Sequence, residues 1–269
     1  RTNGSISLEN SAMICGGVTW GNEATDALIT RNNGTVCPGH ERIGYDKAKP
    51  DDQQVTVPDI ELPVPVLPAT NDNAGICRPG TCPTGGTVLW NPTARTLSMN
   101  NNPTITVSGN VFVLCRLTMD NSSKLYLDPT DRTKPVRIYF DSPERCGGQT
   151  NPVDFDNNIT IATTVTDGPP IQFYALGSPV TATSLTFSNN NVGRTIQIYA
   201  PQSTVKVDNH GTFTGGIAAK QVLLENNVDV HAPSSPTRLE LGTGVEFERG
   251  PFTECTSSAT AGQSLSQGC

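Results

Sequence analysis

The stretch from residue 194 to 231 constrains the fold more than any other part of the chain. Its apolar residues alternate with polar ones in short pairs, and Gly, Asn or Pro separates most of them: Ile196/Ile198, Val205/Val207, Ile217/Ala219, Val222/Leu224 and Val228/Val230. Alternation with a period of two buries one face of a strand, and the interruptions turn the chain after every few residues. Three short strands pass before the pattern repeats, which is typical of a parallel β-helix.

Similar pairs occur along most of the chain from residue 88 onward. They include Leu97/Met99, Ile105/Val107, Val111/Val113, Leu117/Met119, Leu125/Leu127, Ile159/Ile161, Ile171/Phe173 and Leu185/Phe187. Helices are expected to be few, because 25 Gly and 21 Pro are scattered through the sequence and no window carries a helical apolar stripe. The sequence therefore predicts an all-β fold, a right-handed parallel β-helix stapled by disulfides and carrying a proline-rich insertion.

Composition divides the chain into four parts. We expect the first coil or coils of the β-helix in residues 1–37, a proline-rich arm or insertion in 38–75, the main β-helix in 76–249, and a Ser/Thr/Gly-rich tail in 250–269. Proline cannot donate to a sheet ladder, so the arm is either disordered or a strap that lies along the helix and is pinned by Cys37 and Cys77. The segment with Leu239/Leu241 and Val245/Phe247 is the candidate cap at the C-terminal end.

The eight cysteines point to an exported protein. Their number is even, no CxxC motif is present, and only three histidines accompany them, so four disulfides fit better than zinc ligation. Eight cysteines allow 105 pairings, and we expect the local ones: Cys15 with Cys37, Cys77 with Cys82, Cys115 with Cys146, and Cys255 with Cys269. The expected location is extracellular.

Asparagines recur where the predicted strands turn. Asn tolerates the left-handed backbone conformation, and an Asn stacked on its equivalent in the next coil can share side-chain amide hydrogen bonds with it. The candidate ladder and turn positions are Asn189, Asn209 and Asn227. We interpret them as structural residues rather than ligands.

Charge and motifs exclude several classes of function. The net charge of −7, without clustered Lys and Arg, argues against a nucleic-acid partner. No apolar stretch approaches the roughly 20 residues of a membrane span. The sequence contains no nucleophile elbow, Walker loop, dinucleotide fingerprint, zinc-protease motif or calcium loop. We therefore expect no catalytic residues, no metal, no cofactor and no enzymatic activity.

Two carboxylates support an alternative hypothesis. Asp154 and Asp156 lie two residues apart in the strand-like segment VDFDN, so both could project from one face about 7 Å apart, close to the spacing that glycosidases use. Such pairs also arise by chance among 25 acidic residues. The alternative is a secreted carbohydrate-binding or polysaccharide-cleaving β-helix protein.

Three sequence blocks resemble a known family: residues 111–147, 196–207 and 212–231. They are similar to the β-helix region of bacterial type IV pilus-associated proteins, the PilX- and TadG-like pilin ectodomains. The positions that carry the likeness are Tyr199, Ala200, Pro201, Thr204, Val205, Gly211, Gly216, Ile217, Ala219, Lys220, Val222, Leu224, Asn227, Val230 and His231. The family usually carries an N-terminal apolar pilin helix, which this sequence lacks, so we expect that helix to have been removed or to be supplied by a separate small pilin.

The resemblance implies a structural function. It suggests a surface-exposed β-helical subunit or ectodomain of a bacterial type IV pilus or pilus-like extracellular filament, with adhesion as a further role. The implied partners are other pilus subunits, among them a helical pilin and copies of the chain itself, and surface glycans.

Overall fold

The structure is a computed structural model that describes residues 6–15, 18–19, 28–38, 42–43, 63–76, 88–166, 168–188, 195–209 and 212–231. In these residues the chain is mostly β-strand, and its helical content is limited to two 3-10 turns, η2 (Asn73–Gly75) and η3 (Pro143–Arg145). Nearly all strand pairs are parallel, and the largest sheet has 15 strands. The prediction of a mostly β fold dominated by parallel strands is confirmed.

The strands fall into three groups, which we call stacks 1, 2 and 3. Stack 1 contains β8 (Thr96–Met99), β11 (Arg116–Met119), β14 (Val153–Phe155), β17 (Ser184–Ser188), the second halves of β18 (Ile196–Asp208) and β19 (Thr212–Leu224), β1 (Ile6–Leu8) and β4 (Leu28–Thr30). Stack 2 contains β9 (Thr104–Ser108), β12 (Lys124–Asp128) and β15 (Thr160–Thr163), and a second run made by the start of β19, β20 (Asp229–His231), β2 (Met13–Cys15) and β5 (Thr35–Val36). Stack 3 contains β10 (Val111–Leu114), β13 (Val136–Phe140), β16 (Ile171–Ala175), the first half of β18 and the middle of β19, with β3 (Val18–Thr19) and β6 (Arg42–Ile43) as a separate pair.

The chain visits the stacks in a fixed order. Each pass places one strand in stack 1, the next in stack 2 and the next in stack 3, as in β8, β9 and β10 and then β11, β12 and β13. β18 and β19 are each 13 residues long and bend from one stack into another, with a register shift between Ala200 and Thr204. These two strands therefore join stacks 1 and 3, and the second run of stack 2, into one sheet.

The inward side chains of all three stacks form one apolar core. Aromatic rings fill its middle part, where Phe173 contacts Phe140, Phe155 and Phe187 at centroid distances of 5.5, 6.2 and 6.4 Å. These four rings are at most 1% exposed. Edge-to-face and offset rings add attraction to the area they bury, so this aromatic cluster helps to hold stacks 1 and 3 together.

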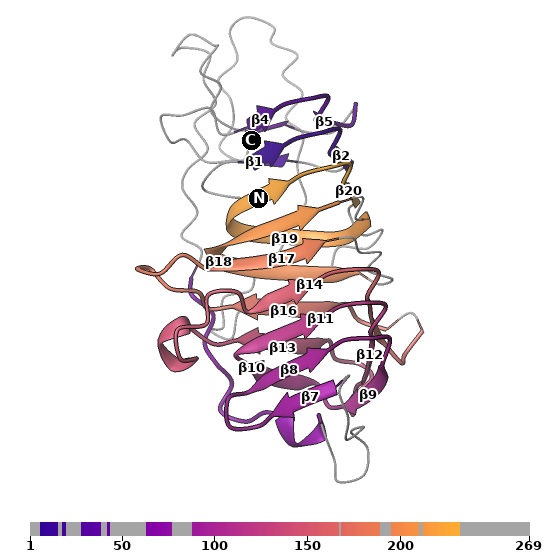
Figure 1. The fold of residues 1–269 in the computed structure, drawn as a ribbon, viewed down its shortest axis with the longest axis vertical. Helices are drawn as coiled ribbons and strands as arrows, with labels where there is room; N and C mark the ends of the chain where they lie inside the picture. Colours follow the sequence, from indigo (N-terminus) through magenta and orange to yellow (C-terminus); the bar gives the residue numbers. More distant parts are fainter. Residues whose placement is uncertain are drawn as a thin grey trace, which may run out of the picture.

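The N-terminal strands lie at the far end of the molecule from β7 (Val88–Asn91), although β7 follows them in sequence. β1 pairs in parallel with the end of β19, with Ile6 opposite Val222, and β2 pairs with β20, with Ile14 opposite Val230. Figure 1 shows the indigo N-terminal strands beside the orange β19 and β20, and the purple β7 at the other end. The predicted first coil therefore stacks after the strand that comes last among the described residues.

The segment 63–76, most of which belongs to the proline-rich arm, runs along the outside of stack 3, where Figure 1 draws it as a purple trace along one side. We call it the strap. Leu67 packs against an outward-facing cluster of stack 3, and the Tyr199 hydroxyl donates a 2.7 Å hydrogen bond to the carbonyl oxygen of Pro63. Two alternatives were predicted for the arm, disorder or a strap, and residues 63–75 form a strap. Cys77, its predicted anchor, lies outside the described residues.

One predicted alternation is wrong. In β10 the residues that enter the main core are Phe112 and Leu114, whereas Val113 faces outward into the cluster under the strap and Val111 is half-buried against the same cluster. The strap covers the outer face of β10, so apolar residues are buried on both sides and the alternation is lost. The candidate C-terminal cap at residues 239–247 and the tail lie outside the described residues.

Candidate functional site

The most regular feature of the molecule is the corner where the chain leaves stack 1 for stack 2. We call it the asparagine corner, and its residues have a positive φ: Asn10, Ser11, Asn32, Asn33, Asn101, Asn102, Asn121, Ser122, Asn157, Asn158, Asn209, Asn226 and Asn227. The left-handed conformation costs most residues about 1–2 kcal/mol, and Asn is one of the few that adopt it readily. Asn therefore sets the direction of the chain at each corner.

Side-chain amides connect successive corners. Asn32 Nδ2 donates to Asn10 Oδ1 at 2.9 Å, and Asn10 Nδ2 donates to Asn226 Oδ1 at 2.9 Å. Asn226 Nδ2 in turn donates to Asp208 Oδ1 at 2.6 Å and to Asn209 Oδ1 at 3.4 Å. At the other end of the molecule Asn121 Nδ2 donates to Asn100 Oδ1 at 2.7 Å. The amides thus hydrogen-bond along the stack direction, parallel to the backbone ladder.

The three asparagines singled out from the sequence have different places. Asn209 has a φ of 56° and accepts the hydrogen bond from Asn226. Asn227 has a φ of 59°, and its backbone N–H donates to the carbonyl oxygen of Asn10 at 2.8 Å. Asn189 lies outside the described residues. At most of these corners two successive residues have a positive φ. The side-chain amides that join neighbouring corners come from the first of the two, as at Asn226. The sequence analysis did not distinguish it from the second, Asn227.

Two of the four expected disulfides are present among the described residues. Cys15 is bonded to Cys37, and Cys115 to Cys146. The other four cysteines, Cys77, Cys82, Cys255 and Cys269, lie outside the described residues. The first disulfide joins the neighbouring strands β2 and β5, and the second joins the end of β10 to the turn η3.

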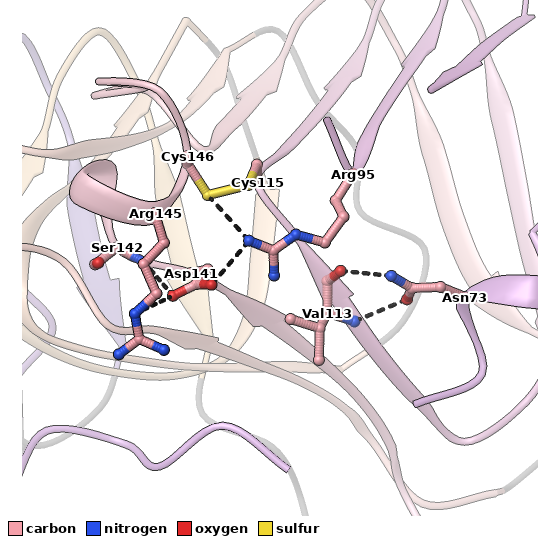
Figure 2. A network of polar contacts seen from close by, with 8 residues as sticks. All are labelled: Asn73, Arg95, Val113, Cys115, Asp141, Ser142, Arg145 and Cys146. Atoms are coloured by element: carbon pink, nitrogen blue, oxygen red, sulfur yellow. Dashed lines mark hydrogen bonds and ion pairs between the residues drawn. A yellow bond between two sulfur atoms is a disulfide. The ribbon is translucent and has the colours of Figure 1, made fainter. Parts of the chain in front are cut away.

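A buried carboxylate, that of Asp141, stabilises the turn beside the second disulfide. The Asp141 side chain is 2% exposed, and Arg95 Nη2 donates to its Oδ2 at 2.9 Å. The backbone N–H of Ser142 donates to Oδ1 at 2.8 Å, and Arg145 Nε lies 3.7 Å from the same oxygen. Figure 2 shows both arginines pointing at this carboxylate, with the Cys115–Cys146 disulfide next to Arg95. The hydrogen bonds from Arg95 and Ser142 compensate the burial of the carboxylate, so this network stabilises the turn.

The end of the strap covers the free edge of β10. The Asp72 N–H donates to the carbonyl oxygen of Val111 at 2.7 Å, and its Oδ2 accepts from the N–H groups of Asn110 and Val111 at 2.8 and 2.9 Å. The Asn73 amide accepts from Val113 N and donates to Val113 O at 2.9 and 2.7 Å, as Figure 2 shows. These two side chains make the hydrogen bonds that another strand would make. An exposed edge invites pairing with a second chain, and here the strap prevents it.

Three tyrosines lie in a column under the strap. Tyr139, Tyr174 and Tyr199 occupy equivalent positions in β13, β16 and β18 and are at most 5% exposed. Tyr139 and Tyr174 stack with centroids 4.8 Å apart. Burial raises the pKa of Tyr199 to about 12. A buried phenol that hydrogen-bonds a carbonyl is suited to fixing the strap.

The two carboxylates of the alternative hypothesis have structural partners. Asp154, in the middle of β14, accepts a 3.2 Å hydrogen bond from Arg116 Nη2, and each side chain of this ion pair is 36% exposed. Asp156 follows the strand and accepts from the backbone N–H of Asn157 at 2.8 Å, at the start of the asparagine corner. The cation beside Asp154 comes from the next strand of stack 1, so the pair contributes to strand pairing.

Lys206 makes a similar polar contact further along stack 1. Its Nζ lies 3.2 Å from Asp208 Oδ2 and 3.1 Å from Glu225 Oε2. Desolvation lowers the pKa of this ammonium, but the hydrogen bonds to Glu225 and Asp208 outweigh it, so the pKa of Lys206 ends above its ordinary value. Within the described ranges no group of three or more His, Cys, Asp or Glu side chains could hold a metal ion.

Comparison with known proteins gives one assignment. A family model matches residues 72–237, more than half of the chain. The chain belongs to the DUF7305 family. This family is described as a domain of unknown function. The match begins at the end of the strap and includes β7 to β20, whereas β1 to β6 lie before it. No curated protein and no solved structure matches the chain.

The sequence analysis missed the residues whose hydrogen bonds and ion pairs hold the strap and the turns against the outer side of the strands. Asp72 and Asn73 do not belong to an alternating strand pattern, and Arg95 and Asp141 lie 46 residues apart in the sequence. The residues next to them in sequence therefore do not indicate which groups they bind. The column of tyrosines is a sequence signal for the strap, because an aromatic residue recurs in successive strands on the side that would otherwise be polar. Such a recurrence indicates that the outer face of those strands is covered.

Proposed function

We propose that the three stacks are the faces of a right-handed parallel β-helix and that this DUF7305 chain is a structural protein. In this proposal it is a surface-exposed subunit or ectodomain of a bacterial type IV pilus or pilus-like extracellular filament. The observation that carries the proposal is the ladder at the asparagine corner, because its amides bond along the stack from one corner to the next. Repetition of this kind makes a long, stiff body in which each pass contacts its neighbours.

The outer side chains support the structural role. In the described residues, Arg116, Asp154 and Lys206 all form ion pairs within the chain. No helix in the described ranges is long and apolar enough to cross a membrane. The identification as a filament component rests on the sequence blocks that resemble pilus-associated ectodomains, and the disulfides favour an oxidising, extracellular location. The proposed partners are other pilus subunits, a helical pilin among them.

The proposal is tested by isolating surface filaments. Filaments sheared from the cells that produce this chain are purified, and the chain is quantified against the major filament protein by mass spectrometry. We expect the chain in a fixed ratio to that protein in every preparation. Recovery of the chain only as free monomer in the medium would overturn the proposal. Deletion of the filament assembly machinery is the control, since it removes the chain from the sheared fraction in the proposed case.

A further inference from the structure

Three Asn-x-Ser/Thr triplets lie at the asparagine corner. They begin at Asn33, Asn121 and Asn158, and a fourth, at Asn3, lies outside the described residues. In an exported protein such a triplet is the acceptor for an N-linked glycan, because the transferring enzyme recognises the asparagine amide and the hydroxyl group two residues later. Triplets of this kind are common in a chain rich in Asn and Thr, so their place in the fold decides which of them can serve.

The corner uses its two positive-φ residues in different ways. The first residue contributes its side-chain amide to the ladder, as Asn157 does when its Nδ2 donates to Asp120 Oδ1 at 2.6 Å. The second residue contributes its backbone, as Ser122 does when its N–H donates to the carbonyl oxygen of Asn157 at 2.8 Å. Serine stands at the second position in Ser11 and Ser122. The ladder therefore needs no side-chain amide at the second position.

Asn121 is a first residue, and its triplet is used inside the fold. Its Nδ2 donates to Asn100 Oδ1 at 2.7 Å, in the direction of the neighbouring corner. The hydroxyl group of this triplet belongs to Ser123, which is 0% exposed and donates to the carbonyl oxygen of Asp120. In the folded chain both groups that the enzyme recognises are therefore engaged. A glycan on this nitrogen would lie between two corners.

Asn33 and Asn158 are second residues, and their triplets face solvent. Both are exposed and have φ values of 68° and 61°. Within the described residues neither side-chain amide has a hydrogen-bond partner. The hydroxyl groups of the two triplets belong to Thr35, which is exposed, and Thr160, which is partly exposed at the start of β15. Both acceptor groups are thus accessible without unfolding.

The middle residue of each triplet holds its turn in place. Ile159 is 1% exposed and belongs to the apolar core. Gly34 lies so close to the neighbouring pass that a Cβ atom there would come within 2.3 Å of the carbonyl oxygen of Leu8. These contacts fix the backbone of both turns, so the asparagines stay on the outer side of the corner.

We propose that Asn33 and Asn158 are acceptors of N-linked oligosaccharides and that Asn121 is not modified. The co-substrate is an oligosaccharide linked to a lipid pyrophosphate. A bond forms between the asparagine Nδ2 and the anomeric carbon of the sugar, while the bond from that carbon to the pyrophosphate oxygen breaks. The amide nitrogen loses one proton, and the lipid pyrophosphate leaves. The inference requires an exported chain, which the disulfides favour, and it is independent of the filament function.

The corner contains a natural counterpart that differs in its middle residue. Asn102, Pro103 and Thr104 occupy the equivalent place before β9, since Lys124 pairs with both Thr104 and Thr160. Asn102 is exposed and has a φ of 62°. Proline in the middle of the triplet abolishes the acceptor. Asn102 is therefore expected to stay unmodified in the same molecule.

The test is mass spectrometry of the full chain purified from the cells that produce it, with sequencing of its glycopeptides. We expect one glycan on Asn33, one on Asn158 and none on Asn121. A glycan on Asn121, or bare asparagines at both proposed sites, would overturn the proposal. Because each asparagine is assigned by its own peptide, one bare site overturns the assignment at that site.

The matched variants change the triplets without changing the acceptor asparagine. Thr160→Ala is expected to remove the glycan from Asn158, whereas Thr160→Ser keeps the hydroxyl group and should retain it. Pro103→Ile gives the counterpart the same triplet as the one at Asn158, so a new glycan is expected on Asn102. A bare Asn102 in this variant, beside a modified Asn158, would show that the corner position does not make the acceptor.

The glycan and the filament are measured separately. A glycosylated chain that is recovered only as free monomer supports the glycan sites and overturns the filament function. An unmodified chain in sheared filaments leaves the filament function intact and overturns the glycan sites.

Discussion

The family domain, residues 72–237, and the N-terminal unit, which consists of strands β1 to β6, are built by the same rules but stabilised differently. Both use parallel strands and the asparagine corner, with Asn121 in the domain and Asn10 in the unit at equivalent turns. A cluster of phenylalanines fills the inside of the domain, and the strap covers part of its outside. The unit has strands of two or three residues and aliphatic inward side chains.

This difference separates what specifies the fold from what stabilises it. The corner and the strand pairing define the path of the chain in both regions. The stability of each region depends on core volume and external contacts, because burial of apolar area dominates the folding free energy. We therefore expect the domain to unfold as the more stable part and the N-terminal unit to detach first.

The largest effect is expected from the aromatic core. Phe173→Ala removes a ring that contacts three others, and truncation of a buried Phe costs about 3–5 kcal/mol. Leu8→Ala in the N-terminal unit is the matched change, at a residue that is 0% exposed. Urea denaturation with hydrogen exchange should show global destabilisation for Phe173→Ala, and faster exchange confined to residues 6–38 for Leu8→Ala. Equal global loss in both variants would show that the two regions unfold as one.

A smaller effect is expected at the corner that joins the two regions. Asn226→Ala loses the amide bonds to Asp208 and Asn10 and also places Ala at a φ of 56°. The two costs together are about 2 kcal/mol. Asn226→Gly isolates the hydrogen-bond part, because Gly adopts a positive φ without strain, and should lose about half as much in thermal or urea unfolding. If Gly and Ala are equally destabilising, backbone strain has no part in the corner.

The smallest effect at neutral pH is expected at the strap. Tyr199→Phe removes the hydrogen bond to Pro63, worth about 1 kcal/mol. The pKa of Tyr199 is raised from 10.0 to about 12, so its contribution is complete below pH 10 and is lost as the pH rises toward 12. Denaturant midpoints measured from pH 8 to 12 should fall more steeply for the wild type than for Tyr199→Phe. Parallel curves would show that this phenol does not titrate with unfolding.

Much of the repeating structure could be predicted from the sequence. The alternation in Leu97/Met99 and Ile105/Val107 predicts the buried side of β8 and β9, and the local spacing of cysteines predicts both disulfides described here. The prediction fails at β10, because Val113 faces outward into the cluster of stack 3 that the strap covers and not into the main core. Local alternation carries no information on what covers the outer face.

The sequence by itself determined the strand pattern and the corners. Apolar residues at every second position define the buried face of a strand, and Asn at a turn permits the left-handed backbone conformation. Both requirements are local, so they can be read from neighbouring residues in the sequence. Only the tertiary structure decided which end the first strands cover, where the strap lies and which partners Asp141 and Asp154 take. Those outcomes depend on contacts between residues far apart in the chain, which local sequence patterns do not encode.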